Sequence, residues 1–165
     1  MSITLRYAVK TDLPEVLALI RELATYERAP EEVTVTIEEL ERDGFGDKPI
    51  YEIILAEENG EIAGMAFYFY AYSTWKGKCV FLEDIIVKES LRGRGIGRAL
   101  FDAVVLKCKE ENARRMMWQV LDWNEPAINF YRKYDAILDP TWVNGKLTAK
   151  QIQDFIPNTE LTVYK

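Results

Sequence analysis

The stretch that decides the fold runs from Cys79 to Glu111 and reads CVFLEDIIVKESLRGRGIGRALFDAVVLKCKEE. Its apolar, β-branched beginning, Cys79–Val87, predicts a strand, and Ile96–Glu111 has helical spacing. Between them lies the glycine-rich loop Arg92-Gly93-Arg94-Gly95-Ile96-Gly97. Alternating glycines let a backbone turn tightly and bring its N–H groups close to an anion. We therefore expect a phosphate-binding loop here, with a simple strand-to-helix turn as the alternative.

The charge around the loop points to a particular anion. Arg92, Arg94 and Arg98 add positive charge, and the N-terminus of the following helix adds unpaired N–H groups. A pyrophosphate fits this arrangement. No Gly-Lys-Ser/Thr follows, which excludes a Walker loop, and the spacing is GxGxG, which differs from the dinucleotide fingerprint.

Upstream of this stretch, the sequence predicts a short strand at Leu5–Val9 and two helices. The first helix starts at Asp12, and its apolar stripe consists of Leu13, Val16, Leu17, Ile20, Leu23 and Ala24. The second has Thr36 and Glu39 as a capping box, and we expect Gly44 to end it.

Two further strands precede the loop, and weaker elements follow it. The sequence predicts strands at Tyr51–Glu57 and Glu61–Tyr72, joined by a turn at Asn59-Gly60. The Asn-Gly pair is a strong hairpin signal. The expected downstream elements are a strand at Met116–Leu121, a helix from Asn124 to near Tyr134, a turn at Asn144-Gly145 and a weak strand at Leu161–Tyr164. This order predicts one α/β domain over residues 1–165, with a mixed, mostly antiparallel central sheet flanked by helices.

Composition removes several classes of chemistry. The chain has no histidine, so Ser-His-Asp sites, Cys-His sites and histidine metal clusters are excluded. Its 27 acidic and 21 basic residues give a net charge of −6, which disfavours nucleic acid and suits a cationic small molecule. Cys79 and Cys108 form no CxxC, and we expect reduced thiols in a cytoplasmic protein. The sequence also predicts no signal peptide, membrane span or metal.

The glycine loop resembles the (Q/R)-x-x-G-x-(G/A) loop of the GCN5-related N-acetyltransferases (GNAT), which cradles the pyrophosphate of coenzyme A. Several stretches resemble the diamine acetyltransferase branch, the spermidine/spermine and thialysine group. They are LATYE at Leu23–Glu27, DGFG at Asp43–Gly46, YAYSTWKG at Tyr70–Gly77, LED at Leu82–Asp84 and LDWNEPAINFY at Leu121–Tyr131. The likeness runs in order from about Leu5 to Leu138.

The resemblance implies an acetyl-CoA-dependent enzyme with a defined set of site residues. Tyr131 corresponds to the general acid that protonates the leaving thiolate, and Glu83 to the acid that receives the amine proton through an ordered water. Without the resemblance, Tyr131 would read as a packed aromatic and Glu83 as a solvated strand-end charge. Beside Tyr131, the implied cofactor contacts are Ile85, Ile86, Val87, Arg92, Gly93, Arg94, Gly95, Ile96, Gly97, Arg98, Asn124, Pro126 and Ala127.

The resemblance also implies which residues contact the amine acceptor, and they lie in two further segments. Besides Glu83, the implied contacts are Tyr26, Glu27, Met117, Trp118, Gln119 and Asp122. An acidic, aromatic wall suits a cation through ion pairing and cation–π contact. Ordinary core or dimer packing is the alternative for the tryptophans. The YSTW and VLDW stretches favour a shorter acceptor, such as a lysine analogue or small diamine, over a long polyamine.

The chain also departs from the branch near its end. Asp135-Ala136 replaces the usual Gly-Ala, Pro140 and Thr141 precede Trp142 without an acid, and the tail over residues 143–165 diverges. The leading hypothesis is direct acetyl transfer to a small amine, in a homodimer. The alternatives are a protein or peptide acetyltransferase acting on lysine or an N-terminus, and a non-catalytic acyl-CoA sensor of the same fold.

Overall fold

The computed structural model describes residues 3–156, and the chain divides into two compact units, Met1–Trp123 and Asn124–Lys165. The first unit holds a five-stranded sheet in the order β1-β2-β3-β4-β5. Neighbouring strands are antiparallel except β4 and β5, which are parallel. The mixed, mostly antiparallel sheet flanked by helices is therefore confirmed. The strands are β1 (Ile3–Tyr7), β2 (Glu52–Glu58), β3 (Glu61–Ser73), β4 (Gly77–Val87) and β5 (Met116–Met117).

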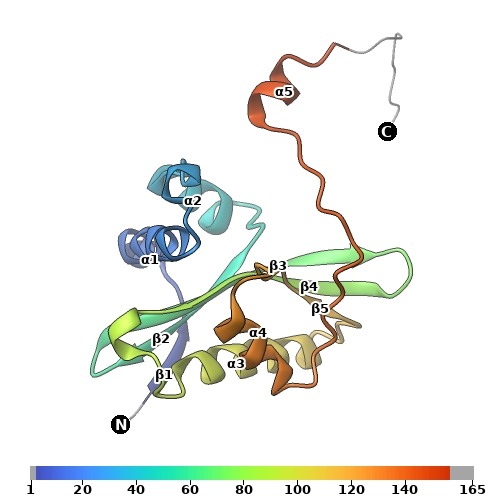
Figure 1. Cartoon of the computed structure of the whole chain (residues 1–165). Helices are drawn as coiled ribbons and strands as arrows, with labels where there is room; N and C mark the ends of the chain where they lie inside the picture. Colours follow the sequence, from blue (N-terminus) through green and yellow to red (C-terminus); the bar gives the residue numbers. More distant parts are fainter. Residues whose placement is uncertain (1–2, 157–165) are drawn as a thin grey trace. The chain divides into compact units, whose positions relative to one another are not determined.

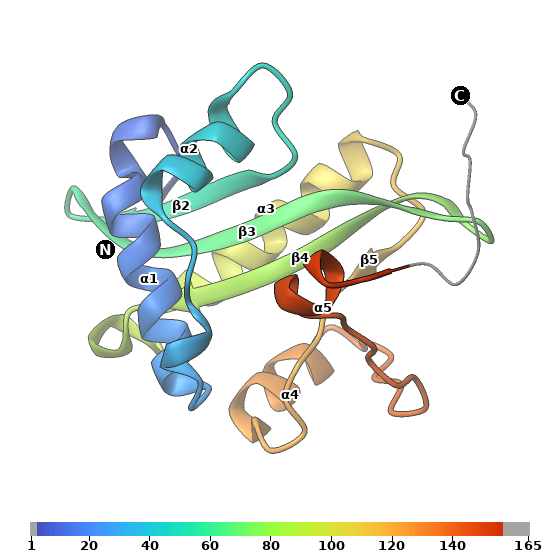
Figure 2. The ribbon, with the colours of Figure 1, turned by 90° about the horizontal axis from the view of Figure 1, so that it is seen from above.

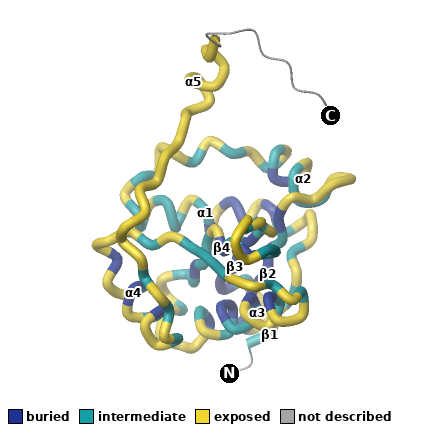
Figure 3. Tube along the Cα trace, turned by 90° about the vertical axis from the view of Figure 1, so that its right-hand side faces the viewer, coloured by how far each residue is buried: buried dark blue, intermediate teal, exposed yellow. Residues whose placement is uncertain are grey.

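Helices cover both faces of this sheet (Figures 1 and 2). Helices α1 (Leu13–Tyr26) and α2 (Ile37–Phe45) lie on one face, and α3 (Ile96–Glu110) lies on the other. The core under α1 contains Leu13, Val16 and Leu19 against strand residues such as Leu55 and Met65. Each such burial stabilises the fold by about 1.5–3 kcal/mol. In Figure 3 the buried residues of this unit line the strands and the inner sides of its helices.

The N-terminal elements form largely as their sequence predicts. The capping box at Thr36 is present, because Thr36 Oγ1 accepts from the Glu39 N–H and the Glu39 carboxylate accepts from the Thr36 N–H. Gly44, however, does not end α2, which continues to Phe45. A Cβ at Gly44 would lie 2.3 Å from the Tyr51 ring. This glycine therefore permits close packing and is not a helix stop.

The hairpin between β2 and β3 is confirmed. Asn59 has φ 55° and Gly60 has φ 83°, the left-handed pair that a tight hairpin turn needs. The expected strand at Met116–Leu121 is wrong in length, because β5 ends at Met117. Met116 and Met117 pair only with Val80 and Phe81 of β4. Within residues 3–156, no strand pairs with that edge of β4 beyond Phe81.

The second unit contains α4 (Glu125–Arg132) and α5 (Ala149–Gln153). Asn124 caps α4, since its Oδ1 accepts from the Ala127 N–H at 3.3 Å. Asp135 has φ 54°, so the backbone is left-handed where the branch usually has glycine. Aspartate tolerates that conformation, which accounts for the departure. The expected strand at Leu161–Tyr164 lies outside the described residues.

Candidate active site

The glycine loop leaves its backbone accessible. Gly93 has φ 77° and Gly95, the residue before α3, has φ 86°. A Cβ at either position would meet no atom within 4 Å. Two left-handed glycines with open space around them, at the start of a 15-residue helix, form a cradle of N–H groups. These residues fit a pyrophosphate.

The three arginines of the loop differ in their surroundings. Arg94 pairs with Glu58 at 3.1 Å, and the Glu58 side chain is only 4% exposed. Arg92 donates from Nε to the Val87 carbonyl at 3.1 Å, and Arg98 lies 3.7 Å from Asp102 along α3. Since every one of them has a protein partner, the loop's side-chain charge is partly neutralised. The backbone amides and helix terminus are then the main attraction for phosphate.

We expect Gly95→Ala to weaken acetyl-CoA binding. A Cβ in left-handed backbone costs about 1–2 kcal/mol, and the loop can relieve this strain by leaving its cradle shape. The KM for acetyl-CoA should rise about 5- to 30-fold, a range set by that cost. Gly60→Ala is the matched control, because Gly60 has φ 83° and equally open surroundings at the β2–β3 turn. If both variants raise this KM equally, the loop has no special role.

The unpaired edge of β4 lies directly before the loop. Ile85, Ile86 and Val87 pair with β3 on one side, opposite Ala66, Met65 and Gly64 respectively. On the other side, the pairing of β4 with β5 ends at Phe81, before these residues. Edge N–H and C=O groups without a neighbouring strand can bind an amide-containing chain by strand-like hydrogen bonds. This edge thus fits the pantetheine arm of coenzyme A.

Glu83 occupies a β-bulge. Phe67 pairs with Asp84 and Tyr68 pairs with Leu82, so Glu83 is an extra residue without a partner on β3. Simple alternation predicts Glu83 and Asp84 on opposite faces, and this rule does not apply across the bulge. Asp84 shares the face of its partner Phe67, which packs against the α1 core.

Asp84 is the titratable group most affected by these surroundings. Burial, together with the nearby charges of Glu83 and Glu27, raises the pKa of its carboxyl to about 7. Burial also raises the pKa of Glu27. The carboxylates of Glu27 and Glu83 therefore act on the carboxyl group of Asp84. An ammonium group bound here would relieve their repulsion, and a carboxylate with a pKa near 7 is suited to accept its proton.

Aromatic rings and arginines form a row of contacts at the end of α1. The Arg92 guanidinium carbon lies 5.0 Å from the centre of the Tyr26 ring. The ring centres of Tyr26 and Trp123 are 6.1 Å apart, and the Arg28 guanidinium carbon lies 4.5 Å from the Trp123 ring. This row of contacts connects Arg92 of the glycine loop with the end of α1. The cation–π contacts expected for a substrate are thus made partly by the protein's own arginines.

The residues expected along β5 do not all face the acids. Met117 pairs with Phe81, which stacks on Phe69 on the α1 side of the sheet. Trp118 instead packs edge-on against Phe101 of α3, with ring centres 5.4 Å apart. Trp118 thereby belongs to packing on the opposite face. The remaining two expected contacts, Gln119 and Asp122, are exposed.

The residues expected from the second unit lie on α4. Pro126 is exposed, Ala127 is half-buried and Tyr131 is buried at 4% exposure. Pro126 lies in the first turn of α4, where its missing N–H costs no helical hydrogen bond. The Phe130 ring packs edge-on against Tyr131, with ring centres 5.3 Å apart. Phe130 of the same helix therefore packs against the Tyr131 ring.

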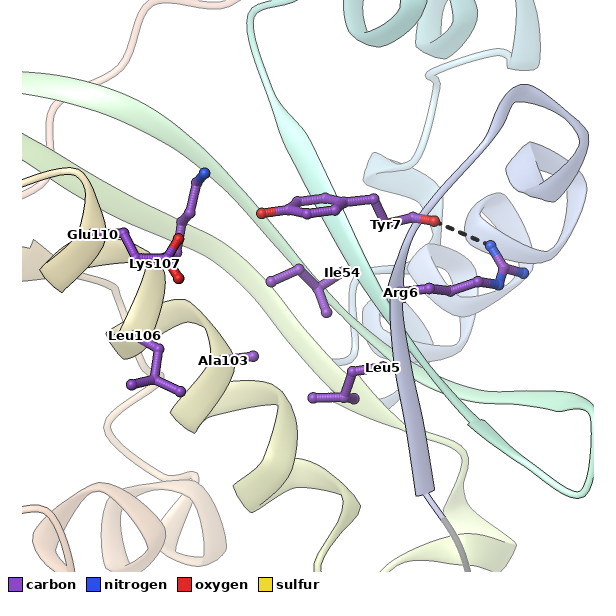
Figure 4. A pocket seen from close by; sticks show the side chains of 8 residues that line it. All are labelled: Leu5, Arg6, Tyr7, Ile54, Ala103, Leu106, Lys107 and Glu110. Atoms are coloured by element: carbon purple, nitrogen blue, oxygen red, sulfur yellow. Dashed lines mark hydrogen bonds between the residues drawn. The ribbon is translucent and has the colours of Figure 1, made fainter.

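Other features of the described residues do not compete as sites. Cys79 and Cys108 are free and buried, and burial raises the pKa of the Cys108 thiol, which disfavours a nucleophilic thiolate. Residues 3–156 contain no cluster of metal-ligating side chains and no helix suited to crossing a membrane. A hollow of about 270 Å³ lies on the α3 side, lined by Leu5, Ile54 and Leu106 (Figure 4). Asp84 is not among the residues that line it.

Comparison with known proteins decides the family. A model described as the acetyltransferase (GNAT) family matches residues 13–135. The chain belongs to the GNAT family. It is an N-acetyltransferase, as the sequence resemblance predicts.

Two curated GNAT relatives match most of this chain. Thialysine N-epsilon-acetyltransferase from Bos taurus is 37% identical over 142 residues, covering 81% of this chain and 84% of the bovine protein. Spermidine/spermine N(1)-acetyltransferase-like protein 1 from Homo sapiens is 34% identical over 140 residues, covering 81% of this chain and 20% of that protein. The resemblance to the diamine acetyltransferase branch is thereby confirmed.

A solved structure shows the same GNAT fold. An integron cassette protein from the mobile metagenome of V. cholerae superposes with a TM-score of 0.75 and 21% identity. The match covers 93% of this chain and 96% of that one.

Sequence reasoning missed four residues of this region. Asp84 follows Glu83 directly, and strand alternation would place the two side chains on opposite faces, a rule that the bulge invalidates. Arg28 follows Tyr26-Glu27 directly, and Trp123 lies within the LDWN stretch, so both were visible beside recognised motifs. Glu58 carries no sequence signal, because its pairing with Arg94 spans 36 positions of the chain.

Proposed function

We propose that this GNAT enzyme transfers the acetyl group of acetyl-CoA directly to the primary amine of a small cationic acceptor. The observation that carries this proposal is the acidic group formed by Glu27 at the end of α1 with Glu83 and Asp84 of β4, the strand that leads into the glycine loop. The names of the relatives, which specify thialysine and spermidine/spermine, support a small amine.

The glycine loop would hold the cofactor, and the acidic group would bind the amine. Acetyl-CoA supplies an activated thioester. Gly93, Gly95 and the start of α3 would hold its pyrophosphate, and the edge of β4 would align its pantetheine arm. One N–H of that edge would stabilise the oxyanion that develops during attack.

The amine must lose a proton before it attacks, because free alkylammonium groups have a pKa near ~10.4. The acidic group would bind the ammonium, and Glu83 would receive the proton through a water. Asp84 lies next to Glu83 and has a pKa of about 7, so it is a second acceptor for that proton. Tyr131 would protonate the departing thiolate. The buried, free cysteines favour a direct transfer without an acyl-enzyme.

The test is thiol release from acetyl-CoA in the presence of thialysine, lysine, ornithine, putrescine, spermidine or a lysine-containing peptide. We expect release only when a small amine is present, together with an acetylated amine of the correct mass. Acetylation of the peptide alone would support a protein acetyltransferase. Acetyl-CoA binding with no acetylation of any amine would support a sensor. Either result would contradict the proposal.

A cytosolic location and a homodimer also belong to this proposal. Two buried, unpaired thiols suit a reducing compartment. Light scattering coupled to size-exclusion chromatography should give twice the 19.1 kDa chain mass, and a monomer mass would contradict the dimer.

A further inference from the structure

Glu58, at the end of β2, is a buried acid with no part in the proposed transfer. Its side chain is only 4% exposed, and its backbone lies in the sheet between Ile3 of β1 and Glu61 of β3. Its Oε2 atom pairs with Arg94 at 3.1 Å, whereas Oε1 is buried without a hydrogen-bond donor among residues 3–156. A buried carboxylate is costly unless a cation compensates its charge. Glu58 therefore depends on Arg94.

Arg94 joins this fixed strand end to the glycine loop. Its Nη1 donates to Glu58, and its Nη2 donates to the Ser90 carbonyl at 3.4 Å, just before the loop. One guanidinium thus connects β2 with the segment that enters the loop, while its own backbone lies inside the loop. Because both contacts are to the protein, the side chain of Arg94 serves the loop as an anchor.

The backbone on both sides of Arg94 has little else to hold it. Gly93 and Gly95 flank it with φ values of 77° and 86°, and a Cβ at either position would meet no atom within 4 Å. Glycine has more backbone freedom than any other residue, so a loop of this kind can adopt many shapes. Few of those shapes direct several N–H groups at one anion. An anchored Arg94 would reduce the entropy that the loop loses when it binds.

We propose that Glu58 is a positioning residue for coenzyme A, which acts through Arg94 to hold the glycine loop in the shape that binds the pyrophosphate. The negative charge of Glu58 alone would repel a phosphate. Positioning and repulsion therefore predict opposite changes in affinity when that charge is removed. The inference rests on the proposed use of acetyl-CoA and adds a residue outside the loop to the cofactor site.

Calorimetric titration with coenzyme A measures the effect without an acceptor amine. In Glu58→Gln, the Kd for coenzyme A should rise about 3- to 10-fold, because a neutral hydrogen bond to Arg94 is about half as strong as a charge-assisted one. Glutamine has nearly the same size as glutamate, and the Arg94 side chain is 40% exposed, so its charge remains solvated and the fold should persist.

Glu57→Gln is the matched control for this titration. Glu57 precedes Glu58 on the same strand, and it pairs with an arginine of β1, Arg6, at 2.8 Å. The control removes a carboxylate from an ion pair that does not involve the loop. It should leave the Kd for coenzyme A at the wild-type value, even if its Tm falls.

A double-mutant cycle tests whether Glu58 acts through Arg94. Arg94→Gln should raise the Kd for coenzyme A at least as much as Glu58→Gln, and the double variant should raise it no further. Additive effects would show that Glu58 acts independently of Arg94 and would overturn the inference. Arg94→Gln leaves a buried acid without its cation, which lowers stability, so Tm is measured for each variant.

Truncated acetyl donors separate positioning of the loop from a general effect on the fold, and they require only Glu58→Gln. S-acetyl-pantetheine lacks the pyrophosphate, whereas acetyl-dephospho-CoA keeps it and lacks only the phosphate on the ribose. With an amine that the wild type acetylates, kcat/KM should fall about 3- to 10-fold for acetyl-CoA and acetyl-dephospho-CoA, through KM alone. The value for S-acetyl-pantetheine should not change.

The outcomes distinguish this inference from the function on which it rests. If the wild type does not bind coenzyme A, the proposed function itself is wrong. If the wild type binds it and Glu58→Gln leaves the Kd unchanged or lowers it, the function stands and the role of Glu58 is overturned. An equal fall in kcat/KM for all three donors would show a purely structural role and would also overturn it.

Discussion

Tyr131→Phe is expected to lower kcat for acetyl transfer by about 10²- to 10⁴-fold, the usual contribution of a positioned general acid. The substitution removes one hydroxyl from a buried ring and keeps the edge-on contact with Phe130. The KM values for acetyl-CoA and amine should change little, because the hydroxyl acts on the leaving thiolate. Steady-state kinetics with a saturating amine, across pH, provides the measurement.

Tyr134→Phe is the matched control, since Tyr134 packs edge-on against the same Phe130 ring at 5.5 Å. This variant should keep wild-type turnover. If Tyr131→Phe also keeps the wild-type kcat at every pH, another group protonates the thiolate, and the role given to Tyr131 is wrong.

Asp84→Asn is expected to stabilise the protein in a pH-dependent manner. The folded-state pKa of about 7 lies above the ordinary value of 3.8, so the neutral carboxyl favours folding. That contribution is fully present below about pH 3.8 and is lost as pH rises through about 7. At pH 8 the wild type should therefore be less stable than Asp84→Asn by about 2–4 kcal/mol, and the difference should shrink below pH 5.

Urea unfolding at pH 5 and pH 8 measures this difference. Asp47→Asn is the control, because Asp47 is exposed and its removal should leave the pH dependence intact. Glu83→Gln removes one of the charges that raise the Asp84 pKa, so it should shift the transition to lower pH. If the free energies of unfolding of Asp84→Asn and the wild type differ by the same amount at pH 5 and pH 8, the prediction is wrong. Asp84 would then titrate normally in the folded protein.

Local signals predicted most of the fold. The Asn59-Gly60 turn and the Thr36 capping box depend on neighbouring residues alone, and both form as expected. Gly44 was misassigned because its reason is a contact with Tyr51, which helix signals do not encode. The short β5 was missed because strand length depends on pairing with β4, and the apolar pattern continues after the pairing ends.

In the candidate site, too, local features could be predicted from the sequence and contacts between distant segments could not. The glycine loop was predictable, since positive φ and alternate glycines are local properties of a chain. The pairing of Arg94 with Glu58 and the contact of Arg28 with Trp123 join distant segments, so no spacing rule finds them. The bulge at Glu83 shifts the strand register and brings Asp84 onto the α1 side, which alternation alone contradicts.

The measurement that tests the central claim most directly is a rapid acid quench of the enzyme mixed with acetyl-labelled acetyl-CoA, with and without lysine. Without an amine, we predict no labelled protein and no free thiol. With lysine, one thiol should be released for each acetylated lysine formed, and the label should pass to the amine without residing on the protein. Label bound covalently to the chain, or thiol release at the same rate without an amine, would contradict direct transfer to a small acceptor.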